Sequence, residues 1–278
     1  AAPLDWLEVE LTGPVLGADD LGILLERRHI PGWVDESADD GLRWVFYLPR
    51  EPGWKERLGS LGLSAAEKGY EMRIRTSVRD EDWAENWKQF YHPRRLGRRL
   101  VLRPTWEDFE AKSDDLVMAL DPGMAFGTGY HASTRLCLEL LERAPCPGRV
   151  LDYGTGSGIL AIAALLLGAR RAVCVDCDPV AVRAARDNLR QNRLSGRARV
   201  RLGEQPPRSR YDLVMANLVA QVLVELSAEL TGAAGRLIAG GIVEERRDEV
   251  VEAYQARGMR LVDEALEEGW VALGFDRP

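Results

Sequence analysis

The chain has 278 residues, of which 46% are hydrophobic, and a formal net charge of −7 at neutral pH. This length predicts two domains, and no apolar run approaches the roughly 20 residues of a membrane span. The negative charge disfavours broad binding to nucleic acid, which depends on cationic contacts to phosphates, and four cysteines are too few for a disulfide framework. Because residues 1–11 do not resemble a secretory signal, we expect a cytoplasmic protein that does not contact membranes.

The first 78 residues alternate between strand-like and helix-like patterns. Helices are expected at 18–28 and near 64–68, and strands at 4–11, near 33–34, at 42–48 and at 70–78. The resulting β-α-β-β-α-β order is typical of a small α+β ferredoxin-like domain. We expect this domain to end near Val78.

Residues 79–110 are expected to link two domains. The segment 80–90 begins with acidic residues, which suit a helix N-terminus, and places Trp83 and Trp87 on one helical face. A strand is expected at 99–102. Around it lies a cluster of arginines, which indicates either a solvated face with salt bridges, the favoured interpretation, or a contact surface for an anionic partner. The cluster consists of Arg94, Arg95, Arg98, Arg99 and Arg103.

Residues 111–278 show short apolar runs that alternate with amphipathic helical patterns. Such alternation predicts a doubly wound, mostly parallel α/β sheet of the Rossmann-like type. Seven strands are expected, at 150–152, 172–176, 198–202, 213–217, 236–240, 260–263 and 270–275.

The strongest motif is a buried strand that runs into a glycine turn, Gly154, Gly156 and Gly158, and then into an apolar helix. Glycines there let the backbone approach a ligand closely. The spacing G-x-G-x-G differs from the dinucleotide pattern G-x-G-x-x-G, because Ile159 occupies the last position. Asp152 puts a carboxylate beside the turn, which suits the cationic S-adenosylmethionine better than a pyrophosphate. We therefore expect S-adenosylmethionine as the cofactor.

Two further acidic residues follow neighbouring strands. Asp176 ends the second strand, 22 positions after Gly154, where a carboxylate can accept hydrogen bonds from both ribose hydroxyls. Glu204 follows the third strand and either reaches the adenine amino group or is an ordinary surface acid. Asp178-Pro179 predicts a helix start.

A metal site is not expected. Cys174 and Cys177 match the C-x-x-C spacing of zinc and redox sites, but no second Cys or His pair lies at a suitable distance.

Asn217 ends the fourth strand, where its side-chain carbonyl can accept a hydrogen bond from an incoming amine; an ordinary turn former is the less favoured alternative. Upstream, residues 121–134 form an unusual loop whose glycines and hydroxyls can fold over a ligand. The alternative is a plain glycine-rich turn before a helix at 136–141, capped by Ser133 or Thr134.

At this point the sequence resembles the PrmA-type methyltransferases of ribosomal large-subunit protein L11. The motifs that carry the resemblance are DEDWAENWK (80–88), DPGMAFGTGYH (121–131), LDYGTGSGILAIAA (151–164), VDCDP (175–179) and YDLVMANLV (211–219). The resemblance implies a class I methyltransferase domain at 111–278 and an N-terminal domain at 1–78 that recognises the ribosomal protein. It also implies methylation of lysine side chains and the α-amino group, and cofactor contacts from Thr134, Gly154, Asp176 and Asn217. The chain departs from the family pattern H-P-T-T, which here reads His131-Ala-Ser-Thr134.

We therefore expect a protein N-methyltransferase that acts on protein L11, without a nucleic-acid substrate. The alternatives are a methyltransferase for RNA or a small amine, a non-catalytic cofactor-binding module, and a dehydrogenase, which the glycine spacing disfavours. The segment Asn217-Leu218-Val219 lacks the Asn-Pro-Pro turn of many relatives that methylate base nitrogens. The expected catalytic residues are Asn217 and His131, the latter as a helper or a loop anchor. The expected cofactor contacts are Phe126, Gly127, Thr128, Thr134, Asp152, Gly154, Gly156, Gly158, Asp176, Glu204 and Asn217.

Overall fold

The computed structural model describes residues 5–14, 25, 32–35, 42–49, 54–79, 92–120, 129, 131–144 and 148–278. The chain forms two compact units, residues 1–91 and 92–278, and each is described by itself. The expected linking helix at 80–90 lies outside the described residues. The domain boundaries near 78 and 110 remain predictions.

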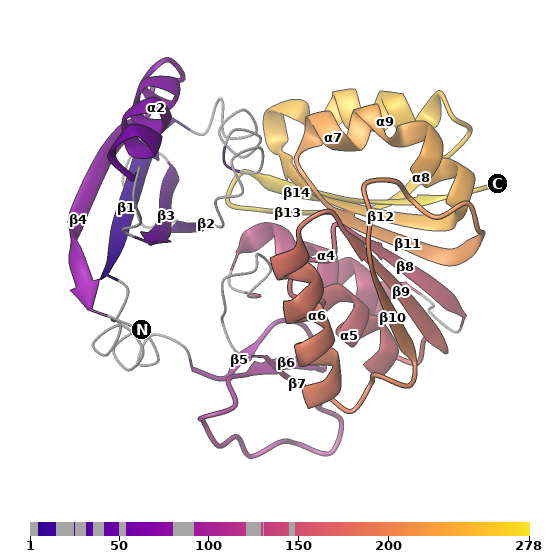
Figure 1. The fold of residues 1–278 in the computed structure, drawn as a ribbon. Helices are drawn as coiled ribbons and strands as arrows, with labels where there is room; N and C mark the ends of the chain where they lie inside the picture. The colour runs from indigo at the N-terminus through magenta and orange to yellow at the C-terminus, as the bar shows by residue number, and fades with distance from the viewer. Residues whose placement is uncertain are drawn as a thin grey trace. The chain divides into compact units, whose positions relative to one another are not determined.

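The N-terminal unit contains a four-stranded antiparallel sheet in the order β2-β3-β1-β4 (Figure 1). This order, with a helix between β3 and β4, agrees with the predicted ferredoxin-like arrangement. Of the helix expected at 18–28, only Leu25 is described, and it is helical. The elements are β1 (Asp5–Gly13), β2 (Gly32–Asp35), β3 (Leu42–Pro49), α2 (Trp54–Ala66) and β4 (Glu71–Arg79).

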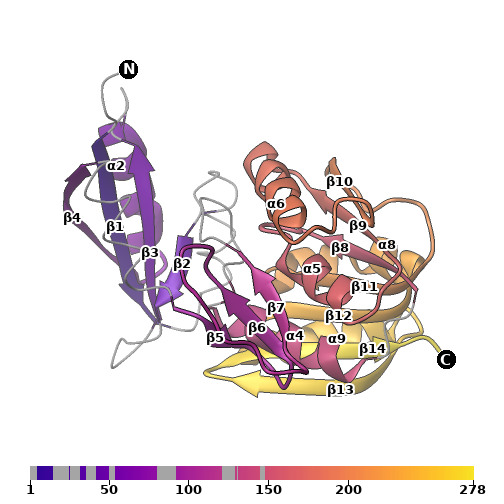
Figure 2. The same cartoon turned by 90° about the horizontal axis from the view of Figure 1, so that it is seen from below.

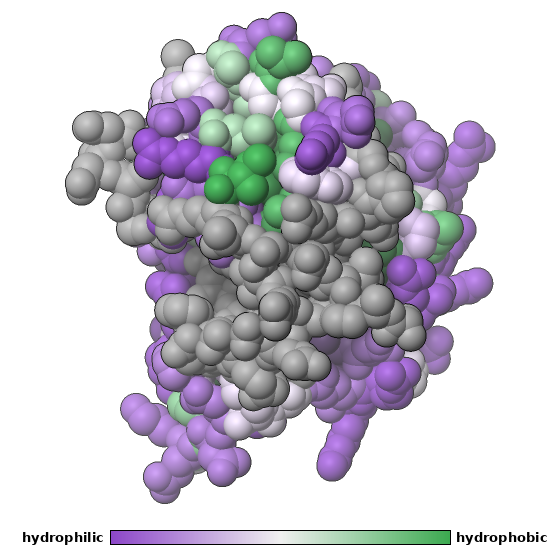
Figure 3. Space-filling model, turned by 60° about the vertical axis from the view of Figure 1, so that its left-hand side comes forward, coloured by the Kyte–Doolittle hydropathy of each residue, from purple (hydrophilic) through white to green (hydrophobic). Residues whose placement is uncertain are grey.

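Helix α2 begins ten residues earlier than expected, and its position follows from packing rather than from local propensity. Leu58, Leu61 and Ala65 recur at helical spacing and are at most 2% exposed. Gly59 and Gly62 weaken the helical signal in the sequence. Leu63, on the same helix, remains 73% exposed. Figure 3 brings the left-hand side of Figure 1 forward and shows apolar surface beside polar surface there.

The second unit is built on a seven-stranded sheet in the order β10-β9-β8-β11-β12-β14-β13. Strands β8 to β12 run parallel, while β14 runs antiparallel to both of its neighbours. All seven predicted strands are confirmed, and the predicted Rossmann-like sheet is therefore correct. They are β8 (Arg149–Tyr153), β9 (Arg171–Asp176), β10 (Ala198–Leu202), β11 (Tyr211–Asn217), β12 (Ala234–Val243), β13 (Arg260–Glu267) and β14 (Trp270–Asp276).

Helices cover both faces of this sheet: α4, α5 and α6 lie on one face and α7, α8 and α9 on the other (Figure 1). The first strand, β8, lies between β9 and β11, so the chain winds in opposite directions on its two sides. Ligands of such sheets bind outside the carboxyl ends of the strands at this switch point. The helices are α4 (Ala132–Arg143), α5 (Ile159–Leu166), α6 (Pro179–Gln191), α7 (Ala220–Glu225), α8 (Ser227–Ala233), the short 3-10 helix η2 (Glu244–Arg246) and α9 (Arg247–Gln255).

A three-stranded sheet, β5 (Arg94–Arg95), β6 (Leu100–Arg103) and β7 (Leu116–Ala119), belongs to the same unit (Figure 2). Strand β6 confirms the strand predicted at 99–102. Glu142 of α4 holds the turn before β6, because its carboxylate accepts hydrogen bonds from the backbone amides of Arg98 (2.6 Å), Arg99 (2.8 Å) and Leu100 (2.9 Å).

The arginines around β6 are in part engaged within the protein. Arg95 forms an ion pair with Asp115 (2.7 Å), and Arg99 Nε donates to the backbone carbonyl of Asp114 (3.1 Å). Arg103 donates to the carbonyl of Glu107 (2.8 Å). These contacts agree with the favoured interpretation, a solvated face with salt bridges.

Among the helices of the described residues, none is long and apolar enough to cross a membrane.

Candidate functional site

The glycine turn lies at the carboxyl end of β8 and is held against β9. The backbone amides of Gly154 and Thr155 donate to the carbonyl of Val175 (2.9 and 3.1 Å). Gly154 has φ +70°, and a Cβ there would lie 2.5 Å from Leu218 Cδ2. Gly158 has φ +83° and precedes α5, where a Cβ would lie 3.3 Å from Ala185 of α6. The left-handed backbone and the close neighbours both require glycine at these positions.

Asp152 is buried beneath the turn, with only 1% of the residue exposed. Its Oδ2 accepts hydrogen bonds from Thr155 Oγ1 (2.6 Å) and from the amide of Ala161 (3.1 Å). Its Oδ1 is buried and has no hydrogen-bond partner among the described residues. Burial raises the pKa of Asp152 to about 7, and the charge of Asp176 adds to this effect. An unsatisfied buried carboxylate oxygen is costly, so this site suits a cationic or hydrogen-bond-donating ligand.

Asp176 lies at the end of β9, where two backbone amides orient its carboxylate. Gly156 N donates to Oδ2 (2.9 Å) and Asp178 N donates to Oδ1 (2.9 Å). Burial raises the pKa of Asp176, while these bonds favour the charged form. Each oxygen keeps further acceptor capacity for a hydroxyl group.

Asp178 and Pro179 start helix α6, as predicted. The Asp178 side chain accepts from Val180 N (2.7 Å), and Pro179 is the first helical residue. The helix therefore begins three residues after Asp176, which fixes the backbone around this carboxylate.

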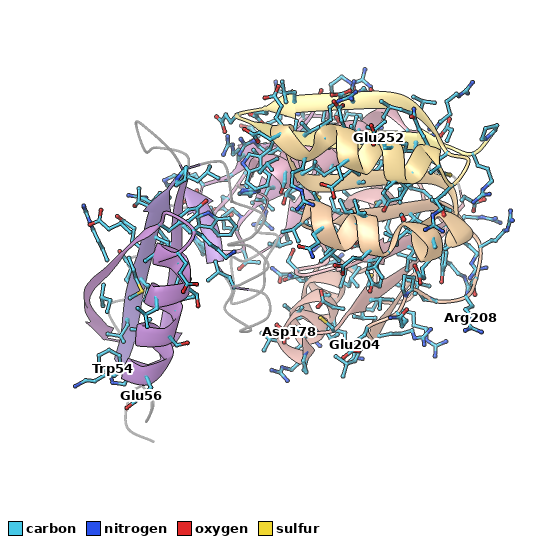
Figure 4. The ribbon with its side chains drawn as sticks, turned by 90° about the horizontal axis from the view of Figure 1, so that it is seen from above. Trp54, Glu56, Asp178, Glu204, Arg208 and Glu252 are labelled. Atoms are coloured by element: carbon cyan, nitrogen blue, oxygen red, sulfur yellow. The ribbon has the colours of Figure 1, made fainter. Side chains whose placement is uncertain are left out.

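Glu204 is exposed and follows β10, at the same end of the sheet as Asp178 (Figure 4). Its backbone carbonyl accepts from the hydroxyl of Tyr153 (2.7 Å), the last residue of β8. Burial raises the pKa of Tyr153 to about 12, so this hydroxyl remains a donor. Tyr153 was missed by the sequence analysis, although an aromatic residue directly before the glycines was a usable signal.

Asn217 ends β11, on the other side of the switch point from Asp176. Its Nδ2 donates to Thr134 Oγ1 (3.2 Å), and Thr134 is completely buried near the start of α4. The other amide atom, Oδ1, is buried and accepts no hydrogen bond from the described part of the chain. Thr134 therefore orients the Asn217 amide and leaves its carbonyl oxygen available.

The loop before α4 is only partly described. Phe126, Gly127 and Thr128 lie outside the described residues. Gly129 has φ +83°, and a Cβ there would lie 2.9 Å from Ile159 Cδ1, at the first residue of α5. The end of the loop is thus adjacent to the helix that follows the glycine turn.

His131 caps helix α4, a role that the sequence analysis gave to Ser133 or Thr134. Its Nδ1 accepts from the amide of Ser133 (3.2 Å) and lies 2.7 Å from the Ser133 hydroxyl, so the imidazole replaces the usual short polar cap. The ring makes an edge contact with Trp270 at 4.7 Å between centroids. Burial, with a contribution from Arg135, lowers the pKa of His131 to about 3, so the ring is neutral.

The cysteines near the site differ in exposure. Cys174 is buried within β9, where burial raises the pKa of its thiol, and Cys177 is exposed after the strand. Within the described ranges, no group of three or more His, Cys, Asp or Glu side chains is arranged to hold a metal ion.

The site thus places two carboxylates and one amide at the carboxyl ends of three adjacent strands. Asp152 pairs in register with Met215, two residues before Asn217, so Asp152 and Asn217 lie on neighbouring strands at the switch point. The partnerless oxygens Asp152 Oδ1 and Asn217 Oδ1 are acceptors that fit a ligand with ammonium or amine groups. Together with the glycine turn, these residues fit S-adenosylmethionine.

Comparisons with known proteins agree with this architecture. Residues 53–278 match the family model described as ribosomal protein L11 methyltransferase (PrmA). A ribosomal protein L11 methyltransferase of Pelotomaculum thermopropionicum is 46% identical over 302 aligned positions, covering 97% of this chain and 98% of the relative. Its counterpart in Chloroflexus aurantiacus is 37% identical over 325 positions, covering 98% of each chain.

Among solved structures, a ribosomal protein L11 methylase of Lactobacillus delbrueckii subsp. bulgaricus is 31% identical. The TM-score is 0.63, and the match covers 67% of this chain and 99% of that one. The resemblance found in the sequence is therefore confirmed: the chain belongs to the ribosomal protein L11 methyltransferase family.

Proposed function

We propose that this protein transfers methyl groups from S-adenosylmethionine to amino groups of ribosomal protein L11, namely lysine side chains and the α-amino group. The observation that carries the proposal is a pair of buried oxygens, Asp152 Oδ1 and Asn217 Oδ1, at the ends of adjacent strands. Neither oxygen has a hydrogen-bond partner among the described residues. Family membership supplies the acceptor, because the relatives are named for this protein.

In this proposal, Asp152 and the glycine turn hold the methionine portion of the cofactor, and the Asp152 carboxylate pairs with its ammonium group. Asp176 accepts hydrogen bonds from the ribose hydroxyls, and Glu204 faces the adenine. Phe126, Gly127 and Thr128 lie on the loop that covers the cofactor. When bound, S-adenosylmethionine supplies an electrophilic methyl group on a sulfonium.

The protein must also present an acceptor nitrogen that is neutral and aligned with the methyl group. A free lysine has a pKa near 10.4 and is mostly charged at neutral pH, but desolvation in a site that already holds a cation lowers that pKa. Asn217 Oδ1 accepts a hydrogen bond from the neutral amine and orients its lone pair, and Thr134 keeps the amide in this orientation. Alignment of this kind supplies much of the rate in a displacement reaction.

His131 acts as a positioning residue in this scheme, because the neutral ring caps the helix that carries Thr134. The N-terminal unit recognises the ribosomal protein, and the enzyme works in the cytoplasm, where ribosomal proteins reside. A methyltransferase acting on RNA or a small amine would keep the same fold and cofactor but would use a different acceptor.

The test is incubation with radiolabelled S-adenosylmethionine, unmethylated L11, ribosomal RNA and a small amine, followed by mass spectrometry. We expect label on L11 amines. Asn217→Ala should reduce kcat about 100-fold, the lower end of the range for loss of one preorganised hydrogen bond. Thr134→Val should reduce kcat in the same direction, and Thr134→Ser, which keeps the hydroxyl, should restore it. Label only on RNA or a small amine would overturn the acceptor, and cofactor binding without any transfer would overturn the enzymatic assignment.

A further inference from the structure

One stretch of the chain carries a positive charge that the overall composition conceals. Residues 183–210 contain nine arginines and only two acidic residues, Asp187 and Glu204, which gives a net charge of +7. The chain as a whole has a net charge of −7, so the other 250 residues carry −14. The arginines of residues 183–210 are called the basic edge below.

The basic edge surrounds the outermost strand of the seven-stranded sheet. Strand β10 is at the end of the strand order and pairs only with β9. Helix α6 packs beside it, and the two lie next to each other in both ribbon views (Figures 1 and 2). The segment 203–210, which connects β10 to β11, forms no helix. Arginines from the helix, the strand and the connection therefore belong to one margin of the sheet.

Two of these arginines alternate along β10 and share one side of the strand. Arg199 and Arg201 are exposed and pair in register with Val173 and Val175. Val175 belongs to the core beneath α7 and α9, and Val173 packs against that core. Arg199 and Arg201 thus extend that face of the sheet outward, about 7 Å apart along the strand.

Most of the basic edge is not neutralised within the protein. Arg190 pairs with Asp187 (2.8 Å), and Arg186 and Arg197 donate to backbone carbonyls. The remaining six have exposed side chains with no ion pair or hydrogen bond to any residue that the structure describes; they are Arg183, Arg193, Arg199, Arg201, Arg208 and Arg210. Figure 4 shows Arg208 at the periphery of the unit. By contrast, Arg247 on α9 is paired with Glu264 (2.6 Å).

We propose that the basic edge is a docking surface for the phosphate backbone of RNA. Guanidinium groups present fixed pairs of donors that match phosphate oxygens, and a row of free cations along an open margin suits an extended polyanion better than a small ligand. Leu202 is the only exposed large apolar side chain within residues 183–210, which is too little apolar surface to insert into a membrane. The overall charge predicts no broad nucleic-acid binding, but local charge governs a docking surface.

The biological setting of this surface rests on the proposed function, since protein L11 is a component of an RNA-rich particle. The basic edge would hold the enzyme against ribosomal RNA while the separate site at β8 and β11 performs the transfer. RNA is therefore the docking partner, not the methyl acceptor.

The experiment measures binding of the full-length protein to a fluorescein-labelled RNA hairpin by anisotropy, between about 50 and 200 mM potassium chloride. Arg199→Gln/Arg201→Gln should weaken binding at least about fivefold and reduce the slope of log Kd against log salt by about 1.5, the value for two lost phosphate contacts. The matched control is Arg98→Gln/Arg257→Gln, which removes two exposed cations elsewhere in the same unit. RNA binding by this control should stay within about twofold of the wild type, since salt screens exposed charges that lie outside the RNA contact surface.

Three results would overturn the proposal: no binding of the wild-type protein to RNA at the lowest salt, equal losses in both double variants, or binding to phosphatidylserine vesicles in place of RNA. Circular dichroism checks that both variants fold. Methylation of free L11 should be unchanged in Arg199→Gln/Arg201→Gln, whereas methylation of L11 within the large subunit should slow. Failure of every protein to methylate L11 would overturn the proposed function and leave the RNA-binding result intact.

Discussion

The carboxylate of Asp152 accepts a 2.6 Å hydrogen bond from the hydroxyl of Thr155, three residues later, and so spans the first glycine of the turn. The same oxygen also receives the amide of Ala161 in α5. One carboxylate oxygen thus ties strand, turn and helix together, while the other has no partner among the described residues. One oxygen of Asp152 therefore has a structural role, and the other, which is buried, keeps acceptor capacity for a ligand.

The first prediction concerns the pH dependence of cofactor binding. Burial raises the pKa of Asp152 to about 7, but a cationic ligand requires the ionised form. Affinity for S-adenosylmethionine should therefore weaken as pH falls below about 7, approaching tenfold per pH unit well below the pKa. Thr155→Val removes a bond that lowers this pKa and should move the transition to higher pH, whereas Thr155→Ser should not. Calorimetric titrations between pH 5.5 and 8.5 measure the effect.

Asp152→Asn serves as the control for this prediction. It should bind the cofactor weakly at every pH and lose the transition. In the ligand-free protein the folded pKa lies above the unfolded value, so ionisation disfavours folding. The contribution of Asp152 to the free energy of unfolding should fall as pH rises from about 4 to about 7, and Asp152→Asn should abolish this fall. A wild-type affinity that is independent of pH would contradict the assignment.

The second prediction separates a structural from a catalytic role of His131. Because burial lowers its pKa to about 3, His131 should not contribute a pKa to the kcat profile between pH 5 and 8. His131→Asn supplies another good helix cap and should keep more activity and stability than His131→Ala, which should cost about 1 kcal/mol of unfolding free energy. The folded pKa lies below the unfolded value, so its contribution to stability should be lost as pH falls from about 6.5 toward 3. Equal inactivation by both variants, with folding intact, would support a catalytic role.

Some elements of this fold are predictable from local sequence patterns, and others depend on contacts that form only on folding. The seven strands of the second unit were predictable because each is a short apolar run next to a helical pattern, and Asp178-Pro179 predicted the start of α6. Helix α2 begins earlier in the chain than predicted, because Gly59 and Gly62 weaken the helical pattern of its apolar residues in the sequence. The capping role of His131 and the hydrogen bond between Asn217 and Thr134 were not predictable, because both depend on contacts that form on folding. The His131 ring also packs against Trp270, and 83 residues separate Thr134 from Asn217.

The third prediction concerns Gly154, which combines a left-handed backbone with a close neighbour. Gly154→Ala should reduce the free energy of unfolding by about 1–3 kcal/mol and cofactor affinity at least about tenfold, because the new methyl group occupies the space between the turn and Leu218. Adding Leu218→Ala should relieve the steric part but not the backbone strain. Gly232→Ala is the matched control: it lies in α8 with no atom within 4 Å of the added carbon, and should be neutral or slightly stabilising. Urea denaturation and titration with cofactor measure both effects, and equal behaviour of the two variants would refute the prediction.

The fourth prediction concerns Glu142, whose carboxylate anchors the β5–β6 turn to α4. Glu142→Ala leaves three backbone amides without their acceptor and should reduce the free energy of unfolding by about 2 kcal/mol, since hydrogen bonds to a charged group are the stronger kind. Glu142→Gln keeps one carbonyl oxygen and should give an intermediate loss. Glu139→Ala, on the same helix, breaks only an exposed pair with Arg143 (3.2 Å) and should cost at most about 0.5 kcal/mol.

Hydrogen exchange locates this effect in the chain. The amides of Arg98, Arg99 and Leu100 should exchange faster in Glu142→Ala and at the wild-type rate in Glu139→Ala, because only the first variant removes their acceptor. Loss of stability without faster exchange at these amides would mean that Glu142 acts through helix α4 itself. Because α4 also carries Thr134, the same variants report whether the anchor influences the site: we expect L11 methylation by Glu142→Ala to decline only at temperatures where the β5–β6 turn has begun to open.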